Sequence, residues 1–94
     1  MIEDLKKRAL HRSRILQGQL RGLEKMIEGE EYCIDIVTQS LAVQKGLSSL
    51  SKLIVENHLR THVTEMMQGD EASRARAIEE LLRVYELTNN RAEK

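Results

Sequence analysis

Apolar residues recur along the chain at intervals of three and four positions, which is the periodicity of one face of an α-helix. In the first third of the chain this stripe consists of Leu16, Leu20, Leu23 and Ile27. The stripe predicts a helix over residues 3–28. The polar cluster that follows contains Gly29, a residue type that commonly caps helix C-termini, and it predicts the end of this helix.

The longest apolar pattern predicts a second helix over residues 32–68. Its central stripe consists of Ile36, Val43, Leu47, Leu50 and Ile54. Further apolar positions widen this surface, namely Val37, Leu41, Val55 and Leu59. At 1.5 Å per residue such a helix is roughly 50 Å long. Because a chain of 94 residues cannot cover a helix of this length by itself, we expect it to pair with another copy of the chain.

A turn over residues 68–71 precedes a predicted third helix over residues 72–88, and residues 89–94 are expected to form a frayed tail. The apolar positions of the third helix are Ala77, Ile78, Leu81, Leu82 and Tyr85. The chain has no Pro, Phe or Trp and only two Tyr, so nothing interrupts the helices and the clusters typical of strands are missing. An all-α fold with one domain over residues 1–94 is therefore predicted.

Charge and cysteine content bear on the partners of the protein and on its cellular compartment. The 15 basic and 15 acidic residues cancel, so net charge gives no sign of a nucleic-acid partner, although the first 25 residues are enriched in Lys and Arg. One cysteine excludes an internal disulfide. Without a leader segment or an apolar run of membrane length, the sequence is typical of a protein of the reducing cytoplasm.

Two histidines offer a candidate metal site. His58 and His62 are four residues apart on the predicted second helix, so both imidazoles lie on one face, one turn apart. Two ordinary histidines on a half-exposed face would show the same spacing, and a metal ion normally needs three or four ligands.

Cys33 is a third candidate ligand, at the other end of the same predicted helix. Roughly 37 Å of helix separates it from His58, so one straight helix cannot bring the two together. Two antiparallel copies can, because the start of one helix then lies beside the end of the other, and a symmetric dimer would hold the site twice. An inert Cys packed in the dimer core is the alternative. A thiolate with two imidazoles suits copper, zinc, nickel or cobalt rather than magnesium or calcium.

Enzyme chemistry finds little support in the sequence. The serines at positions 48, 49 and 51 have no evident base beside them, and Glu79 and Glu80 are adjacent on a helix and do not face each other. No glycine-rich phosphate loop is present. We therefore expect a binding protein and not an enzyme.

Five segments together resemble the copper-sensitive operon repressor family of CsoR- and RcnR-like proteins. They are residues 17–22 (QGQLRG), 32–36 (YCIDI), 41–44 (LAVQ), 57–59 (NHL) and 78–82 (IEELL). The resemblance covers nearly the whole chain in order. It implies three-helix subunits that form antiparallel four-helix dimers and flat tetramers, and a repressor that binds operator DNA without metal and releases it when metal binds.

The resemblance also implies a ligand set. Cys33 and His58 match two copper ligands of the family, one from each subunit, whereas His62 stands where the copper pattern has a second Cys. The nickel- and cobalt-sensing branch has His there too but adds an N-terminal His that this chain lacks. Copper(I) is therefore the favoured metal, with zinc, nickel or cobalt open, and the histidine pair argues against the formaldehyde-responsive branch.

Further roles follow from the same resemblance. Tyr32 and Glu80 match positions that hydrogen-bond the metal-site His, a route by which ligation could change subunit packing. The positions implied for DNA contact are Arg12, Arg14 and Lys52, with Lys45 and Arg21 as weaker candidates. A metal carrier that does not bind DNA and a purely structural helical oligomer remain as alternatives.

Overall fold

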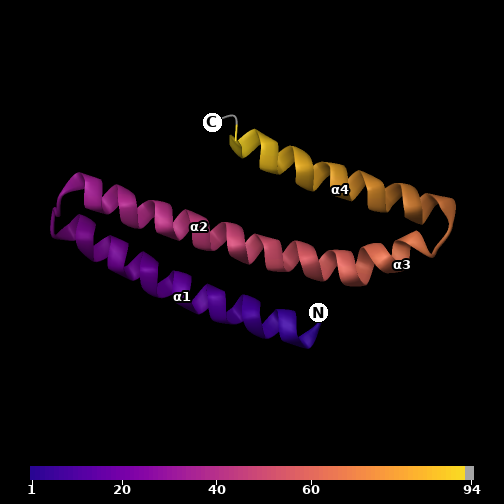
Figure 1. The fold of residues 1–94 in the computed structure, drawn as a ribbon, viewed down its shortest axis with the longest axis horizontal. Helices are drawn as coiled ribbons and strands as arrows, with labels where there is room; N and C mark the ends of the chain where they lie inside the picture. Colours follow the sequence, from indigo (N-terminus) through magenta and orange to yellow (C-terminus); the bar gives the residue numbers. More distant parts are fainter. Residues whose placement is uncertain (93–94) are drawn as a thin grey trace. The chain divides into compact units, whose positions relative to one another are not determined.

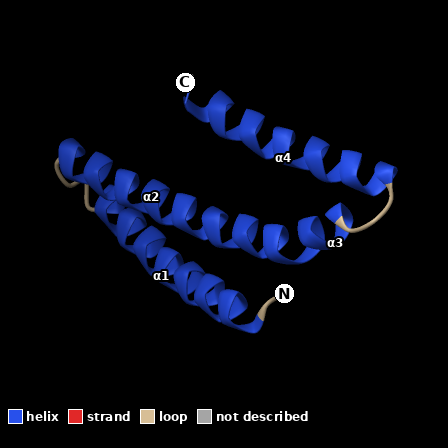
Figure 2. Cartoon of the chain, turned by 45° about the vertical axis from the view of Figure 1, so that its right-hand side comes forward, coloured by secondary structure: helices blue, strands red, loops and turns tan. Residues whose placement is uncertain are grey.

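The computed structural model describes the backbone of residues 1–92 and the side chains of residues 1–88, and every regular element in that range is helical (Figures 1 and 2). The elements are α1 (Glu3–Glu28), α2 (Cys33–His58), the π turn η1 (Leu59–Val63), α3 (Thr64–Met67) and α4 (Glu71–Ala92). The prediction of an all-α chain with three helices is confirmed, since α2, η1 and α3 follow one another without a break.

The predicted helix ends agree with the structure to within a few residues. α1 has the predicted bounds, and the second helical run begins one residue later than predicted and ends one residue earlier. Residues 89–92 continue α4, and the expectation of a frayed tail stays a prediction. Residues 93–94 lie outside the described residues.

The described chain forms two compact units, Met1–Asn57 and a second that begins at His58. The expectation of a single domain over residues 1–94 stays a prediction. In the first unit, α1 and α2 run side by side in opposite directions (Figures 1 and 2).

The seam between α1 and α2 follows a heptad pattern in both helices. On α1 its buried or half-buried positions are Leu5, Ala9, Arg12, Leu16, Gln19, Leu23 and Met26. On α2 they are Val43, Gly46, Leu50, Leu53 and Asn57. Two members of the predicted α1 stripe, Leu20 and Ile27, are 51% and 56% exposed, whereas Leu16 is buried.

Two contacts fix the register of this seam. A Cβ atom added to Gly46 would lie 2.6 Å from Cδ2 of Leu16, so a larger residue here would force the Leu16 side chain to move. Where α1 begins and α2 ends, the side-chain Oδ1 of buried Asn57 accepts a hydrogen bond from the backbone N–H of Ile2 at 2.8 Å. Asn57 thereby satisfies one of the amide groups that a helix N-terminus leaves unpaired.

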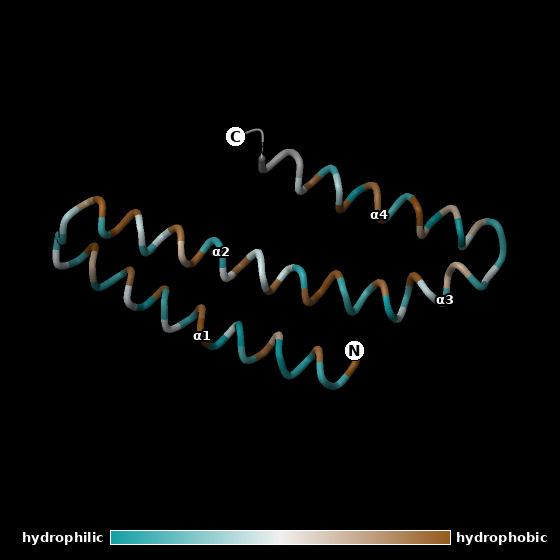
Figure 3. The backbone as a smooth tube through the Cα atoms, in the orientation of Figure 1, coloured by the Kyte–Doolittle hydropathy of each residue, from teal (hydrophilic) through white to brown (hydrophobic). Residues whose placement is uncertain are grey.

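A second apolar face on the same two helices stays exposed. It includes Leu20, Ile27, Ile34, Val37, Leu41, Leu47 and Ile54, and the brown segments that recur along both helices in Figure 3 show how regularly apolar residues are spaced. Among the described residues no large side chain is fully buried. One chain alone thus leaves much of its apolar surface in water.

The connection between α1 and α2 is a tight helix end. Gly29 is the C-cap, as predicted, but its φ of −81° is ordinary, and the left-handed residue is Glu30 with φ 49°. The N–H of Glu31 donates to the carbonyl of Met26 and the N–H of Glu30 to that of Ile27. This pair of hydrogen bonds is the Schellman motif, in which glycine usually occupies the position of Glu30.

At the start of α4, Asp70 acts as the N-cap. Its side-chain Oδ1 accepts the backbone N–H of Ser73 at 2.8 Å, and this hydrogen bond is the main reason why the pKa of Asp70 lies below its ordinary value.

None of the helices within residues 1–92 has both the length and the apolarity needed to cross a bilayer.

Candidate metal centre and nucleic-acid interface

The second unit brings the two candidate histidine ligands together. His58 is the last residue of α2 and His62 lies in the π turn that follows. Their ring centroids are 5.2 Å apart and the ring planes are tilted by 40°. His58 is half-buried and His62 is exposed, so the pair is open to an incoming ligand.

Glu80 on α4 forms a hydrogen bond with one ring nitrogen of His58. Its Oε1 lies 2.8 Å from Nε2 of His58, and its Oε2 lies 3.5 Å from Nε of Arg76. The hydrogen bond with His58, helped by the positive charge of Arg76, lowers the pKa of Glu80 although partial burial opposes the shift. With Nε2 engaged by a carboxylate, Nδ1 is the nitrogen that His58 can offer to a metal ion.

Cys33 and Tyr32 lie at the opposite end of α2 from the histidines. Cys33 is the exposed first residue of α2, and Tyr32 precedes it with 73% of its surface exposed. Within the described part of a single chain, no three His, Cys, Asp or Glu side chains are grouped closely enough to hold a metal ion. One chain therefore supplies two imidazoles at one place and a thiol at another.

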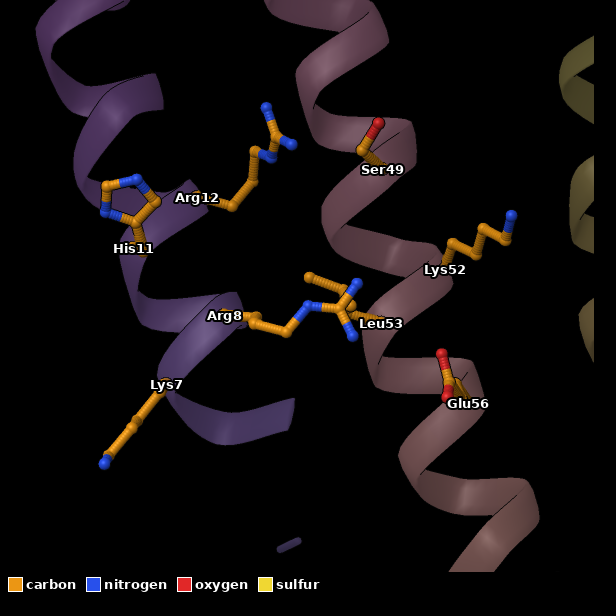
Figure 4. A pocket seen from close by; sticks show the side chains of 8 residues that line it. All are labelled: Lys7, Arg8, His11, Arg12, Ser49, Lys52, Leu53 and Glu56. Carbon is orange, nitrogen blue, oxygen red and sulfur yellow. The ribbon is translucent and has the colours of Figure 1, made fainter. Parts of the chain in front are cut away.

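The first unit carries a basic groove between α1 and α2, with a volume of about 540 Å³. Its lining consists of Lys7, Arg8, His11, Arg12, Ser49, Lys52, Leu53 and Glu56. In Figure 4, Arg8 and Arg12 extend from α1 toward α2, whereas Lys52 extends away from α1. Arg8 also lies 3.8 Å from the carboxylate of Asp4.

Of the five positions expected to contact DNA, Arg12 and Lys52 line this groove. Arg14, Arg21 and Lys45 are exposed but are not part of its lining. Lys7, Arg8 and His11 were not among the expected positions. Their signal in the sequence is a spacing of three or four residues from Arg12 or from one another, which places them on the same side of α1.

Comparison with known proteins relates this chain to a family of transcriptional repressors. Residues 5–86 match the family model described as "Metal-sensitive transcriptional repressor". The copper-sensing transcriptional repressor CsoR of Mycobacterium tuberculosis is 34% identical over 84 residues, which cover 88% of this chain and 68% of that protein. CsoR of Bacillus subtilis is 32% identical over 75 residues, covering 80% of this chain and 72% of that protein.

Solved structures of repressors are also similar to this chain in fold. The crystal structure of the copper-sensing repressor CsoR with Cu(I) from Geobacillus thermodenitrificans superposes with a TM-score of 0.82 at 28% identity, covering 95% of this chain and 91% of that one. A variant of the formaldehyde-responsive regulator FrmR from Salmonella enterica serovar Typhimurium gives a TM-score of 0.68 at 35% identity, covering 88% and 96%. The match over residues 5–86 and the identities of the two CsoR relatives establish that the chain belongs to the metal-sensitive transcriptional repressor family.

Proposed function

We propose that this protein is a copper(I)-responsive repressor that binds operator DNA in its metal-free form and releases it when copper(I) binds. Family membership and the names of its copper-sensing relatives support the function. The observation that carries the metal site is the histidine pair, with rings 5.2 Å apart and with Nε2 of His58 already hydrogen-bonded to Glu80. A repressor of this kind acts where the DNA is, in the cytoplasm.

The complete site is proposed to form between two chains. Cys33 of one chain would meet His58 and His62 of an antiparallel partner, because the thiol and the imidazoles occupy opposite ends of the helical run that starts with α2. The exposed apolar face of α1 and α2 supplies a surface for that pairing, and dimers would pair again into tetramers. A soft thiolate with imidazole donors fits copper(I). Because His62 replaces a second thiolate of the copper pattern, zinc, nickel and cobalt are the runner-up metals.

Glu80 offers a route from the metal site to the rest of the protein. It belongs to α4, whereas His58 ends α2, so their 2.8 Å hydrogen bond joins two elements. Ligation through Nδ1 would fix the orientation of the imidazole and change the strength of the bond from Nε2. Tyr32 is the second residue proposed to act on the metal-site His, from the partner chain.

The basic groove is the proposed contact with DNA phosphates. Four cationic side chains border it, from Lys7, Arg8, Arg12 and Lys52, against the single carboxylate of Glu56. Arg14, Arg21 and Lys45 would extend the same contact outside the groove. Binding through phosphates should depend steeply on salt, since each neutralised phosphate releases counterions.

The function is tested by DNA binding to the region upstream of the gene, with and without copper(I). We expect tight binding without metal and release when copper(I) is added. Cys33→Ala should retain DNA binding and lose the copper response, and parallel titrations with zinc, nickel and cobalt rank the metals. Release of DNA by copper(I) from Cys33→Ala would overturn the ligand assignment, and a wild-type protein that binds copper(I) without binding DNA would be a metal carrier.

The groove has its own test. Arg12→Gln and Lys52→Gln should each weaken DNA binding and reduce the slope of log affinity against log salt by about 1. Arg83→Gln, an equal loss of charge on the exposed surface of α4, is the matched control and should leave the slope unchanged. Equal effects of all three substitutions would mean that overall charge matters and the groove does not.

A further inference from the structure

The two candidate histidine ligands are separated by a change in helix type. His58 ends α2, and His62 lies within the π turn Leu59–Val63. In this turn the carbonyl of Leu59 accepts the backbone N–H of Thr64, five residues further along, and the same N–H also donates to the carbonyl of Thr61. A π turn therefore contains one residue more than an α turn, and such turns are rare and frequently occur at functional sites.

Thr64 makes a second hydrogen bond to the same carbonyl. Its Oγ1 donates to the Leu59 carbonyl at 2.8 Å, a span of five residues. The chain provides its own comparison, because the hydroxyls of Thr38 and Thr88 donate to the carbonyls four residues earlier, as threonines in α-helices commonly do. The hydroxyl of Thr64 thus stabilises the π register itself.

The register decides how the two imidazoles face each other. One extra residue in a turn rotates everything that follows it by roughly 100° about the helix axis. Since the extra residue falls in the turn that contains His62, the 5.2 Å separation and 40° tilt of the rings belong to the π form. Conversion to a regular α-helix would present His62 in another direction relative to His58.

We infer that Thr64 is a positioning residue: it holds the π turn, and the π turn sets the spacing of His58 and His62 for a metal ion. The inference rests on the proposed function for its ligand, and on the hydrogen bonds of Leu59 and Thr64 for its geometry. Thr64 is exposed, and it is not one of the proposed copper ligands. Its effect on the metal is therefore indirect.

Thr64→Val tests the inference, because it removes the hydroxyl and keeps the shape of the side chain. Copper(I) affinity, measured by competition with a chromophoric chelator, should fall about tenfold or more, the size of effect typical of groups that orient ligands. Thr64→Ser restores a hydroxyl and should recover most of the affinity. Thr88→Val, which removes the ordinary four-residue bond on α4, is the matched control and should bind copper(I) like the wild type.

A second readout does not depend on copper. In NMR spectra of the metal-free protein, the ring signals of His58 and His62 should shift in Thr64→Val and stay in place in Thr88→Val. Unchanged ring signals together with unchanged copper(I) affinity in Thr64→Val would overturn the inference. A wild-type protein that binds no copper(I) would overturn the proposed function, while the ring signals would still decide whether Thr64 sets the histidine geometry.

Discussion

At the scale of single residues, two carboxylates tie the stability of the second unit to pH. Glu80 has a lowered pKa chiefly because of His58, and Asp70 chiefly because it accepts the Ser73 N–H. A carboxyl group whose pKa is lower in the folded than in the unfolded state stabilises the fold above its ordinary pKa. That contribution is lost as the pH falls through the lowered value.

Asp70→Asn should separate the charge of this cap from its hydrogen bond. Asn caps a helix about as well as Asp but does not titrate, so the variant should keep the cap and lose stability less steeply on acidification. Thermal unfolding between about pH 7 and pH 3, which brackets the ordinary carboxyl range, measures the difference. Asp70→Ala should be less stable than the wild type near neutral pH, and equal stability of the two there would contradict the capping role.

Glu30 occupies a backbone conformation that suits glycine better. A residue with a Cβ atom loses about 1–2 kcal/mol in the left-handed region, and part of this is offset because glycine is more flexible when unfolded. Glu30→Gly should therefore stabilise the protein by about 0.5–1 kcal/mol, measured by denaturant unfolding. Glu30→Ala keeps the Cβ and should bring no such gain, and destabilisation by Gly would show that the side chain of Glu30 makes a contribution of its own.

At the scale of elements, the sequence predicted the helices better than the faces they bury. α1 and α2 each carry two apolar stripes, and periodicity alone does not tell which stripe meets the same chain. The stripe that packs within the chain is difficult to recognise in the sequence, because it includes Arg12, Gln19, Gly46 and Asn57. The stripe predicted from the sequence combines the two faces, since Leu16 is buried whereas Leu20 and Ile27 are exposed. The π turn Leu59–Val63 was not predicted from the sequence.

Gly46 should resist replacement although it lies inside a helix. Alanine favours the helix by about 1 kcal/mol, but its Cβ would meet the buried Leu16 side chain, and overpacking costs about 1–3 kcal/mol. Gly46→Ala should therefore lower the free energy of unfolding by about 1 kcal/mol. In a Leu16→Ala background the obstacle is gone, so the same substitution should become stabilising. Additive effects of the two substitutions would show that the close approach is unimportant.

At the scale of the whole molecule, one chain brings together only the histidine part of the proposed site. The spacing of His58 and His62 predicted their proximity, and family resemblance pointed to Glu80, whose hydrogen bond the structure shows. The role of Cys33 stays a prediction, because it depends on a second chain. Lys7, Arg8 and His11 were missed because the groove they line depends on how α1 packs on α2.

Mixed dimers test the sharing of the site between chains. Cys33→Ala and His58→Ala should each abolish copper(I) binding when present alone. After the two variants are unfolded together and refolded, mixed dimers should regain one intact site, formed by the Cys33 of one chain and the histidines of the other. The expected copper(I) content is about one site for each mixed dimer by symmetry. No recovery in dimers shown to be mixed would place the ligands elsewhere.

The apolar face that α1 and α2 leave exposed links the folded state to the abundance of the protein. If that face is covered by another copy, folding and association are a single equilibrium, and each tenfold dilution weakens the assembled form by about 1.4 kcal/mol. Repression would then require a minimum number of chains per cell. Below this number, too few chains would associate to form either the copper site or the DNA-binding surface. The expression level of the gene would tune the sensor as directly as any ligand does.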